Sequence, residues 1–180
     1  AAELPEIAEL RIATRADCVD DAVVELLGRV SEKLPVSVEL GLQTIHDETA
    51  KRINRCHTYA EFLEGYHRLK AAGIPVCVHL INGLYGEGHA EMVASARAVG
   101  KLRPDGVKIH MLHIIRDTAL ARDYAENPFP LLTKAEYVAS VAEQVCHLPK
   151  ETVIERLRGD GAAATLLAPQ WTRAKMSVIN

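Results

Sequence analysis

The stretch 36-VSVELGLQ-43 decides the fold, because its apolar and polar residues alternate with a period of two. Successive side chains of a β-strand point to opposite faces of its sheet. The residues of the apolar face are Val36, Val38, Leu40 and Leu42, and those of the polar face are Ser37, Glu39, Gly41 and Gln43. We therefore predict a strand over residues 36–42 that has one apolar and one polar face.

Two further stretches, residues 75–82 and 107–112, alternate in the same way. Their second faces carry Cys77, His79 and Ile81 in one stretch, and Lys108, His110 and Leu112 in the other. Strands covered by helices on both sides would be almost continuously apolar, and a closed eight-stranded barrel would be filled by branched apolar side chains. A wider or incomplete barrel with a polar cavity agrees better, because polar groups buried without partners or a ligand are costly.

Strand-like and helix-like periods alternate along the chain, which predicts parallel βα units of the α/β class. The predicted strands cover residues 8–14, 36–42, 75–82 and 107–112, and the predicted helices cover 18–34, 47–54, 59–72, 87–102 and 134–146. Thr58 and Thr133 each precede a glutamate by three residues, which is the spacing of a capping box. Towards the C-terminus we expect a strand at 152–157, a turn at 159–161 and a short helix at 171–178.

The composition is that of an ordinary soluble domain, with 180 residues of which 48% are hydrophobic and 25% charged. A formal net charge of -3 gives no support to nucleic-acid binding. No apolar stretch is long enough to cross a bilayer, so we predict a cytoplasmic protein without a membrane partner. The four cysteines, which lie far apart and suit neither a disulfide framework nor a CxxC metal site, are Cys18, Cys56, Cys77 and Cys146.

The polar stripes have two interpretations. In the first, Glu39 pairs with Lys108 or with a histidine in an internal network, and no ligand is involved. In the second, the three stripes point into one cavity that binds a ligand. Each residue taken alone fits either interpretation, but three stripes facing one cavity favour a ligand.

Several motifs of the chain resemble those of one enzyme family. The stretches 38-VELGLQT-44 and 54-NRCHT-58 resemble the fourth-strand segment of radical S-adenosylmethionine (SAM) proteins of the elongator-type and coproporphyrinogen-oxidase-like groups. The stretch 78-VHLINGLYGE-87 is similar to the glycine-and-glutamate motif of their fifth strand. The resemblance extends to one uncharacterised bacterial subgroup of this family. The stretches that carry it are 12-IATRADC-18, 106-GVKIHMLH-113, 118-TAL-120 and 168-APQW-171, together with Lys175. The order and spacing of these motifs make the combined match specific.

The resemblance implies that residues 1–150 form the C-terminal part of a six-stranded, TIM-like partial barrel, followed by an extension at 151–180. It also implies SAM as a cofactor, a [4Fe-4S] cluster in the intact protein, and a reductant such as flavodoxin or ferredoxin. The residues expected to bind the cofactor are Glu39, Gln43, His79, Asn82, Gly83, His110 and Leu112. A carboxylate and an amide suit ribose hydroxyls, and a glycine lets the backbone approach the adenine closely.

The chain departs from the family pattern in three places. Cys56 stands where the family usually has glycine, and Tyr85 where it usually has proline. No CxxxCxxC sequence, which holds the cluster in the family, occurs in the chain, so we expect no metal ligand in it. The simplest interpretation is truncation, to which Ala1 as the first residue also points. The intact protein would then use a 5'-deoxyadenosyl radical on an unknown substrate, whereas this chain alone would not cleave SAM.

Two other functions remain open on sequence grounds. Lys108 lies on the inner face of a predicted barrel strand, where it could form a Schiff base as in a type I aldolase. A barrel that has lost its cluster could instead be a non-catalytic binding or regulatory protein.

Overall fold

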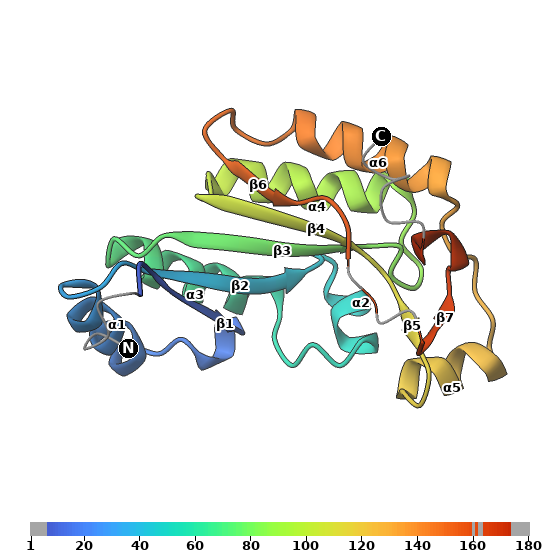
Figure 1. Cartoon of the computed structure of the whole chain (residues 1–180), viewed down its shortest axis with the longest axis horizontal. Helices are drawn as coiled ribbons and strands as arrows, with labels where there is room; N and C mark the ends of the chain where they lie inside the picture. Colours follow the sequence, from blue (N-terminus) through green and yellow to red (C-terminus); the bar gives the residue numbers. More distant parts are fainter. Residues whose placement is uncertain (1–6, 160, 162–163, 174–180) are drawn as a thin grey trace.

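The computed structural model describes residues 7–159, 161 and 164–173 of the chain. Its centre is a parallel five-stranded sheet with the strand order β1-β2-β3-β4-β6 (Figure 1). The strands are β1 (Leu10–Thr14), β2 (Val36–Gln43), β3 (Val76–Asn82), β4 (Gly106–Met111) and β6 (Val153–Arg156). Strands that follow one another in the sequence lie side by side, as successive βα units require. The predicted parallel α/β architecture is confirmed.

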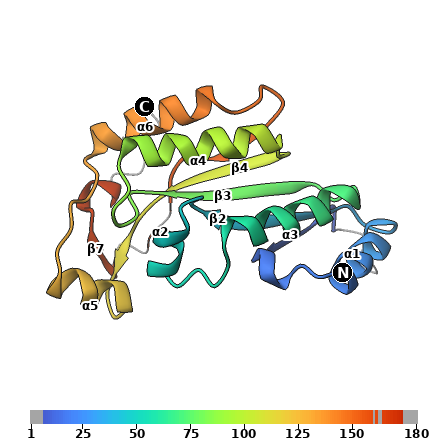
Figure 2. The same cartoon turned by 180° about the vertical axis from the view of Figure 1, so that it is seen from behind.

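Helices cover one face of this sheet. Seen from behind in Figure 2, α3 lies in front of β2 and β3, and α4 lies in front of β4. The helices are η1 (Ala16–Cys18), α1 (Asp21–Ser31), α2 (Asp47–Arg52), α3 (Tyr59–Ala71), α4 (His89–Leu102), α5 (Ala119–Glu126), α6 (Lys134–Cys146) and η2 (Gln170–Arg173). Because α6 packs on α4, the helical layer continues beyond the sheet.

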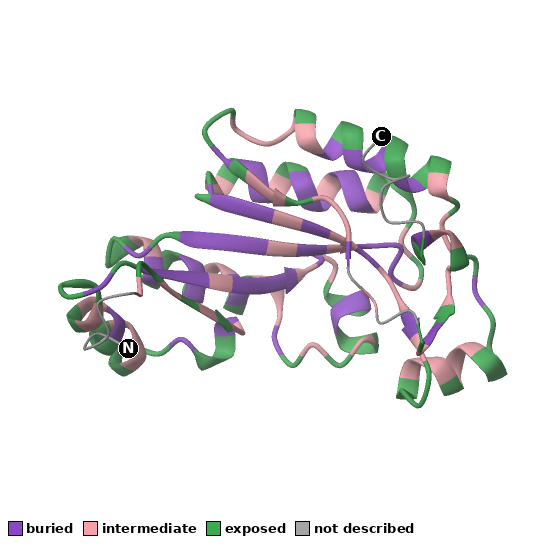
Figure 3. Cartoon of the chain, viewed as in Figure 1, coloured by how far each residue is buried: buried purple, intermediate pink, exposed green. Residues whose placement is uncertain are grey.

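The hydrophobic core lies between these helices and the apolar face of the sheet (Figure 3). The strand residues with 0% exposure are Val38, Leu40, Val76, Val78, Val107 and Ile109. Phe62 and Tyr66 from α3 and Tyr137 from α6 belong to the same core and are at most 1% exposed. Burial of each such side chain contributes about 1.5–3 kcal/mol, so this face determines which side of the sheet the helices cover. The predicted apolar stripes are therefore confirmed.

Both predicted capping boxes are present. The side chains of Thr58 and Thr133 accept from the backbone N–H groups three residues on, and the carboxylates of Glu61 and Glu136 accept in return. Helix α4 begins at His89 rather than at the predicted residue 87, because Gly88 is extended and its N–H donates to the Glu91 carboxylate at 2.9 Å. These caps satisfy backbone donors that the first turn of a helix leaves free.

The segment predicted as one helix over residues 18–34 is divided. A short 3₁₀ turn, η1, ends at Cys18, and α1 begins only at Asp21 because the Asp20 carboxylate accepts from Val23 N at 2.8 Å. An aspartate in this position is a strong N-cap, so it sets the start of the helix.

The C-terminal region supplies more structure than predicted. The strand expected at 152–157 is present as β6, and it pairs with β4 in the main sheet. Strands β5 (Ile114–Ile115) and β7 (Leu166–Ala168) form a separate antiparallel pair, and α5 follows β5. The predicted turn at 159–161 and the predicted helix at 171–178 lie partly outside the described residues, and Lys175 lies outside them.

In the part of the chain that the structure describes, no helix has the length and apolar character needed to cross a membrane.

Candidate functional site

A cavity of about 680 Å³ lies where β2, β3 and β4 end. It is lined by Gln43, Arg52, Ile53, Asn54, Arg55, Ile81, Leu84, Tyr85, Leu112, Ala119, Leu120 and Asp123. These residues come from the ends of the three strands, from α2 and the loop after it, and from α5. Ligands of open parallel α/β sheets bind beyond the carboxyl ends of the strands, so this cavity is the candidate site.

The glycine in the middle of 39-ELGLQ-43 has a steric role. The Arg55 guanidinium donates through Nη2 to the carbonyl oxygen of Gly41. A Cβ at residue 41 would lie 2.5 Å from Arg55 Nη2 and 2.7 Å from Gln43 Nε2. The absence of a side chain at Gly41 therefore makes room for two polar groups of the cavity wall.

Three residues in or next to the cavity wall have a left-handed backbone conformation that is unfavourable for L-residues: Gln43 and Asn54 line the cavity, and Cys56 follows Arg55 in the same loop. The φ angles are +73° at Gln43, +54° at Asn54 and +69° at Cys56. Such a conformation costs about 1–2 kcal/mol for a non-glycine residue. Strain of this kind gathers at functional sites, where surrounding structure holds it in place.

Arg55 is half-buried and has few partners. Its Nε is buried without a hydrogen bond among the described residues. Burial lowers the pKa of Arg55, and the nearby Arg15 charge lowers it further. Arg55 also lines the cavity, where a guanidinium suits an anionic group such as a carboxylate.

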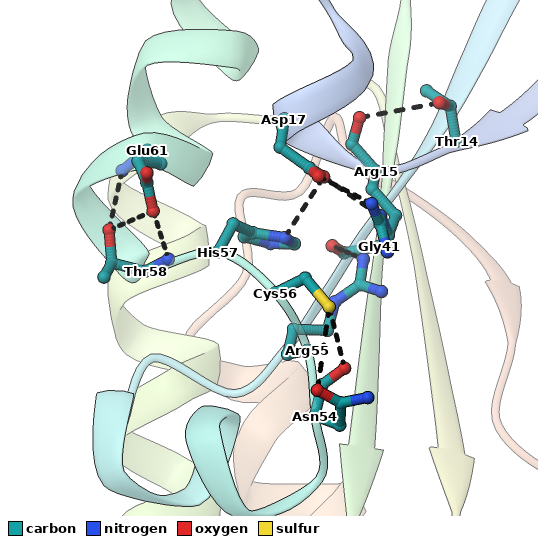
Figure 4. A network of polar contacts seen from close by, with 10 residues as sticks. All are labelled: Thr14, Arg15, Asp17, Gly41, Asn54, Arg55, Cys56, His57, Thr58 and Glu61. Atoms are coloured by element: carbon teal, nitrogen blue, oxygen red, sulfur yellow. Dashed lines mark hydrogen bonds and ion pairs between the residues drawn. The ribbon is translucent and has the colours of Figure 1, made fainter.

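Figure 4 shows the polar groups behind Arg55. The Asp17 carboxylate accepts from Arg15 Nε at 3.0 Å and from Arg15 Nη2 at 2.6 Å. The same carboxylate lies 3.7 Å from Nδ1 of His57, whose side chain is 1% exposed. Burial lowers the pKa of His57, and the Arg55 charge adds to this effect. The loop after β1 and the loop before α3 therefore meet at one acidic residue.

Aromatic and charged side chains form another part of the cavity wall. The Arg52 guanidinium lies over the ring of Tyr85, 2.9 Å from its centroid, and 4.0 Å from the Asp123 carboxylate of α5. Tyr85 also packs edge-on against Phe129 with ring centroids 4.8 Å apart. Tyr85, which replaces the usual proline of the family motif, is thus part of the cavity wall.

The glutamate of the second motif ties two strand ends together. Thr44, just after β2, donates from Oγ1 to the Glu87 carboxylate at 2.5 Å. Burial raises the pKa of Glu87, while this hydrogen bond opposes the change. Gly83 and Gly86 have φ angles of +80° and +79°, so the turn after β3 needs residues without a side chain.

The polar face of the sheet holds an ion-pair network outside the cavity. The Lys108 ammonium donates to the Glu39 carboxylate, and His79 Nε2 lies 3.1 Å from its other oxygen. Burial alone would raise the pKa of Glu39, but the hydrogen bond and charge of Lys108 lower it overall. Glu155 lies 3.6 Å from Lys108 and 2.6 Å from Arg11, and so extends the network. The internal pairing of Glu39 that we considered from the sequence is therefore present.

His110 continues this face towards the cavity. Its ring stacks on that of His79 with a centroid distance of 5.6 Å and an interplanar angle of 24°. Burial lowers the pKa of His110 to about 4, and the neighbouring His79 adds to the effect. Its Nε2 is buried without a hydrogen-bond partner among the described residues. His110 is thus neutral at pH 7 and can still accept or donate one hydrogen bond.

The seven residues expected to bind a cofactor lie in different places. Gln43 and Leu112 line the cavity, whereas Glu39, His79 and His110 lie on the polar face next to it. Asn82 is 1% exposed on the helix side of the sheet, where it exchanges hydrogen bonds of 2.7 and 3.0 Å with Gln144. The structure therefore does not bring the Asn82 side chain to the cavity, because Asn82 shares the face of Val78 and Leu80.

Arg55 was missed as a candidate from the sequence. It lies in the quoted motif 54-NRCHT-58, but nothing in the local pattern shows that its side chain turns back onto β2. Gly83 lies near the turn after β3 with its hypothetical Cβ 3.1 Å from Leu132 Cδ1. That glycine faces the protein and not the open cavity.

The described residues offer no ready-made metal site. Among residues 7–159, 161 and 164–173, no group of three or more His, Cys, Asp or Glu side chains is placed to hold a metal ion. Cys18, Cys56 and Cys146 are exposed, and Cys77 is a buried free thiol. Burial raises the pKa of Cys77 to about 12, which favours its protonated thiol form.

Comparison with family models gives two matches. Residues 1–99 match a model described as the Radical SAM superfamily, and residues 104–180 match a model described as the Radical_SAM C-terminal domain. Between them the two models cover nearly the whole chain.

Two bacterial proteins are similar to most of this chain. The uncharacterized protein YtqA of Bacillus subtilis (strain 168) is 38% identical over 176 residues, which is 98% of this chain and 55% of that protein. Protein YhcC of Escherichia coli (strain K12) is 37% identical over 166 residues, 92% of this chain and 54% of that protein. The chain thus spans about half the length of these relatives.

Solved structures share the fold. An archaeal Elp3 of Methanocaldococcus infernus, with residues 1–46 deleted, superposes with a TM-score of 0.80 at 24% identity, over 89% of this chain and 38% of that one. The radical S-adenosylmethionine methyltransferase TsrM of Kitasatospora setae, solved with cobalamin and a [4Fe-4S] cluster, gives 0.57 at 17% identity, over 66% of this chain and 23% of that one.

Proposed function

Because the chain belongs to the radical SAM superfamily, we propose that the cavity beyond β2, β3 and β4 binds S-adenosylmethionine. One observation carries this proposal. The cavity brings the amide of Gln43 and the guanidinium of Arg55 together with an apolar wall that includes Ile81 and Leu112. A mainly apolar pocket with a few convergent polar groups is typical of a small-molecule site.

Each part of the wall suits one part of the cofactor. The apolar side chains of Ile81, Leu84 and Leu112 suit the adenine ring, whose burial removes apolar surface from water. The amide of Gln43 can both donate to and accept from ribose hydroxyls. Arg55 suits the carboxylate of the methionine part, because a guanidinium forms strong charge-assisted hydrogen bonds with carboxylates.

The residues of this chain do not fit an iron-sulfur cluster. No CxxxCxxC sequence occurs, and the described residues offer no set of metal ligands. We therefore assign to this chain only the binding and orientation of SAM. In a protein of the length of its relatives, we propose that a [4Fe-4S] cluster and a reductant such as flavodoxin or ferredoxin complete the site.

When bound and reductively cleaved in such a protein, SAM supplies a 5'-deoxyadenosyl radical for hydrogen abstraction from a substrate. The part of this chain is to hold the adenosyl group and keep water away from it. Neutral His110 and the ion-paired groups of the polar face lie next to the cavity. We therefore expect them to face the substrate.

A Schiff-base reaction of Lys108 is not favoured. The Lys108 ammonium is hydrogen-bonded to Glu39 and lies 3.6 Å from Glu155, so it is engaged in ion pairs on the polar face and does not line the cavity. Borohydride treatment with small carbonyl compounds should leave Lys108 unlabelled.

Calorimetric titration of this chain with S-adenosylhomocysteine and with methylthioadenosine tests SAM binding. Both share the adenosyl group, and only the first carries the amino-acid part. We expect saturable binding of both, with Gln43→Ala weakening both about tenfold through the loss of a polar contact. Arg29→Ala, at an exposed position of α1, is the matched control and should change neither. No saturable binding of either compound would overturn the proposal.

The activity of the longer protein needs a separate experiment. A version that includes the cluster cysteines would be reconstituted anaerobically with iron and sulfide and reduced in the presence of SAM. We expect 5'-deoxyadenosine. A full cluster without any 5'-deoxyadenosine would exclude radical generation while leaving SAM binding by this chain as a separate question.

A further inference from the structure

We propose that Asp17 and His57 are positioning residues that hold Arg55 towards the carboxylate of the bound cofactor. The inference rests on the proposed function, because it assigns to Arg55 the methionine part of SAM. It adds two residues that do not line the cavity and that belong to different loops. Figure 4 shows Asp17 and His57 together with Arg55 and the contact between the first two.

The two residues connect two segments that the sequence separates widely. Asp17 lies in η1, directly after β1, and His57 lies between α2 and α3, two residues after Arg55. Their side chains approach to 3.7 Å between Asp17 Oδ1 and His57 Nδ1. This approach, with the burial of the His57 ring, places the arginine-bearing loop next to the end of β1.

Asp17 is itself held in one orientation. Arg15 Nε and Nη2 donate to its two carboxylate oxygens at 3.0 and 2.6 Å. A bidentate arginine–carboxylate pair has a defined geometry, unlike a contact with a single donor. The negative charge also offsets the repulsion between Arg15 and Arg55, which are close enough to influence each other. Removal of this charge would leave two guanidinium groups facing each other across the loop.

The loop needs such an anchor because its backbone is strained. Arg55 stands between two residues with left-handed φ angles, +54° at Asn54 and +69° at Cys56. Immediately after His57, Thr58 starts α3 through its capping box. His57, buried at this point, holds the strained backbone conformation in place. That conformation sets the direction of the Arg55 side chain.

His57 is not an ordinary core histidine. Its side chain is 1% exposed, and neither ring nitrogen has a hydrogen-bond partner among the described residues. Burial of an imidazole with both nitrogens unsatisfied costs more than burial of an apolar side chain of the same size. Packing alone therefore gives no reason for a histidine here, and the Asp17 carboxylate is a polar group that the structure places near its Nδ1.

Affinities for two ligands distinguish positioning from a general structural role. In the unmodified chain S-adenosylhomocysteine should bind more tightly than methylthioadenosine, because only the former reaches Arg55. We expect Asp17→Asn and His57→Leu to weaken S-adenosylhomocysteine binding about tenfold and to leave methylthioadenosine within about twofold. In the background of Arg55→Ala, Asp17→Asn should cause no further loss.

Asp20→Asn is the matched control, since asparagine caps a helix as well as aspartate does and the residue lies in the same segment. It should change neither affinity. Equal losses for both ligands, or no loss for either, in a folded Asp17→Asn variant would overturn the positioning role while SAM binding stands. If the unmodified chain binds neither ligand, the proposed function and this inference both fail.

Discussion

The guanidinium of Arg55 occupies the space beside Gly41 that a side chain would fill, with Nη2 only 2.5 Å from where a Cβ would stand. Nη2 also donates to the carbonyl oxygen of the same residue. Gly41 of β2 and Arg55, which follows it by 14 residues, are thus joined by a hydrogen bond and by close packing. Substitutions at either position should affect the other.

Gly41→Ala is therefore expected to damage the site more than the fold. The nearest atoms to the new Cβ are the far ends of the Arg55 and Gln43 side chains, which can move. We expect a loss of stability below about 1 kcal/mol and a loss of about tenfold in affinity for S-adenosylhomocysteine. Gly28→Ala is the control: it meets no atom within 4 Å, lies in α1 and should stabilise the chain by up to about 1 kcal/mol without changing affinity. Similar affinities for both variants would contradict the steric role of Gly41.

Cys56→Gly should stabilise the protein. Cys56 has a φ angle of +69°, which glycine adopts without the steric penalty that a Cβ causes. The relief of about 1–2 kcal/mol is partly offset by the greater freedom of glycine in the unfolded chain, so we expect a net gain of about 0.5–1 kcal/mol. Thermal unfolding should show a Tm raised by about 2 °C. Cys56→Ala keeps the Cβ and should give no gain; an equal gain would assign the effect to the thiol.

Asn82→Ala should lower stability without a direct effect on the cavity. Asn82 and Gln144 exchange two hydrogen bonds and are 1% and 0% exposed. Truncation leaves the Gln144 amide partly unsatisfied, which costs about 1–3 kcal/mol in urea unfolding. A double-mutant cycle with Gln144→Ala should show coupling between the two sites. A folded Asn82→Ala protein that loses ligand affinity with little loss of stability would instead indicate that Asn82 contacts the ligand.

Stability should fall as the pH drops from about 6.5 to about 4, partly because of His110. Its pKa is lowered to about 4 in the folded state, against an ordinary value of 6.5. In that range the unfolded chain binds a proton at His110 that the folded chain does not, so protonation favours unfolding. The contribution is about 2–3 kcal/mol, present in full above pH 6.5 and lost by about pH 4. Urea unfolding of His110→Asn across this range should show a shallower pH dependence; an identical one would contradict the assignment.

The sheet could be predicted because its apolar stripes obey a local rule. In β2, β3 and β4 every second residue packs against helices, so a period of two is written in the sequence itself. The capping boxes at Thr58 and Thr133 are equally local. Strands β5 and β7 could not be found in this way: they contain two and three residues, and they pair across about 50 positions of sequence. A strand of two or three residues is too short for its apolar residues to show a period of two.

The candidate site was predictable only in part for a related reason. Gln43 and Leu112 follow the strand alternation and reach the cavity. Asn82 was assigned to the site from its motif, although its register places it with Val78 and Leu80 on the helix side. Arg55 contributes through a side chain that turns back onto a strand, and such a contact depends on three-dimensional packing rather than on spacing.

The pairing of β4 with both β3 and β6 has a consequence for how the chain unfolds. The two matched family segments meet between residues 99 and 104, yet β4 and β6 come from the second segment and complete the sheet begun by the first. Tyr137 of the second segment is buried in the same core as Phe62 of the first. The two segments share one core, so a cut at this junction would expose apolar surface on both pieces. The two segments form a single cooperative unit whose parts unfold together.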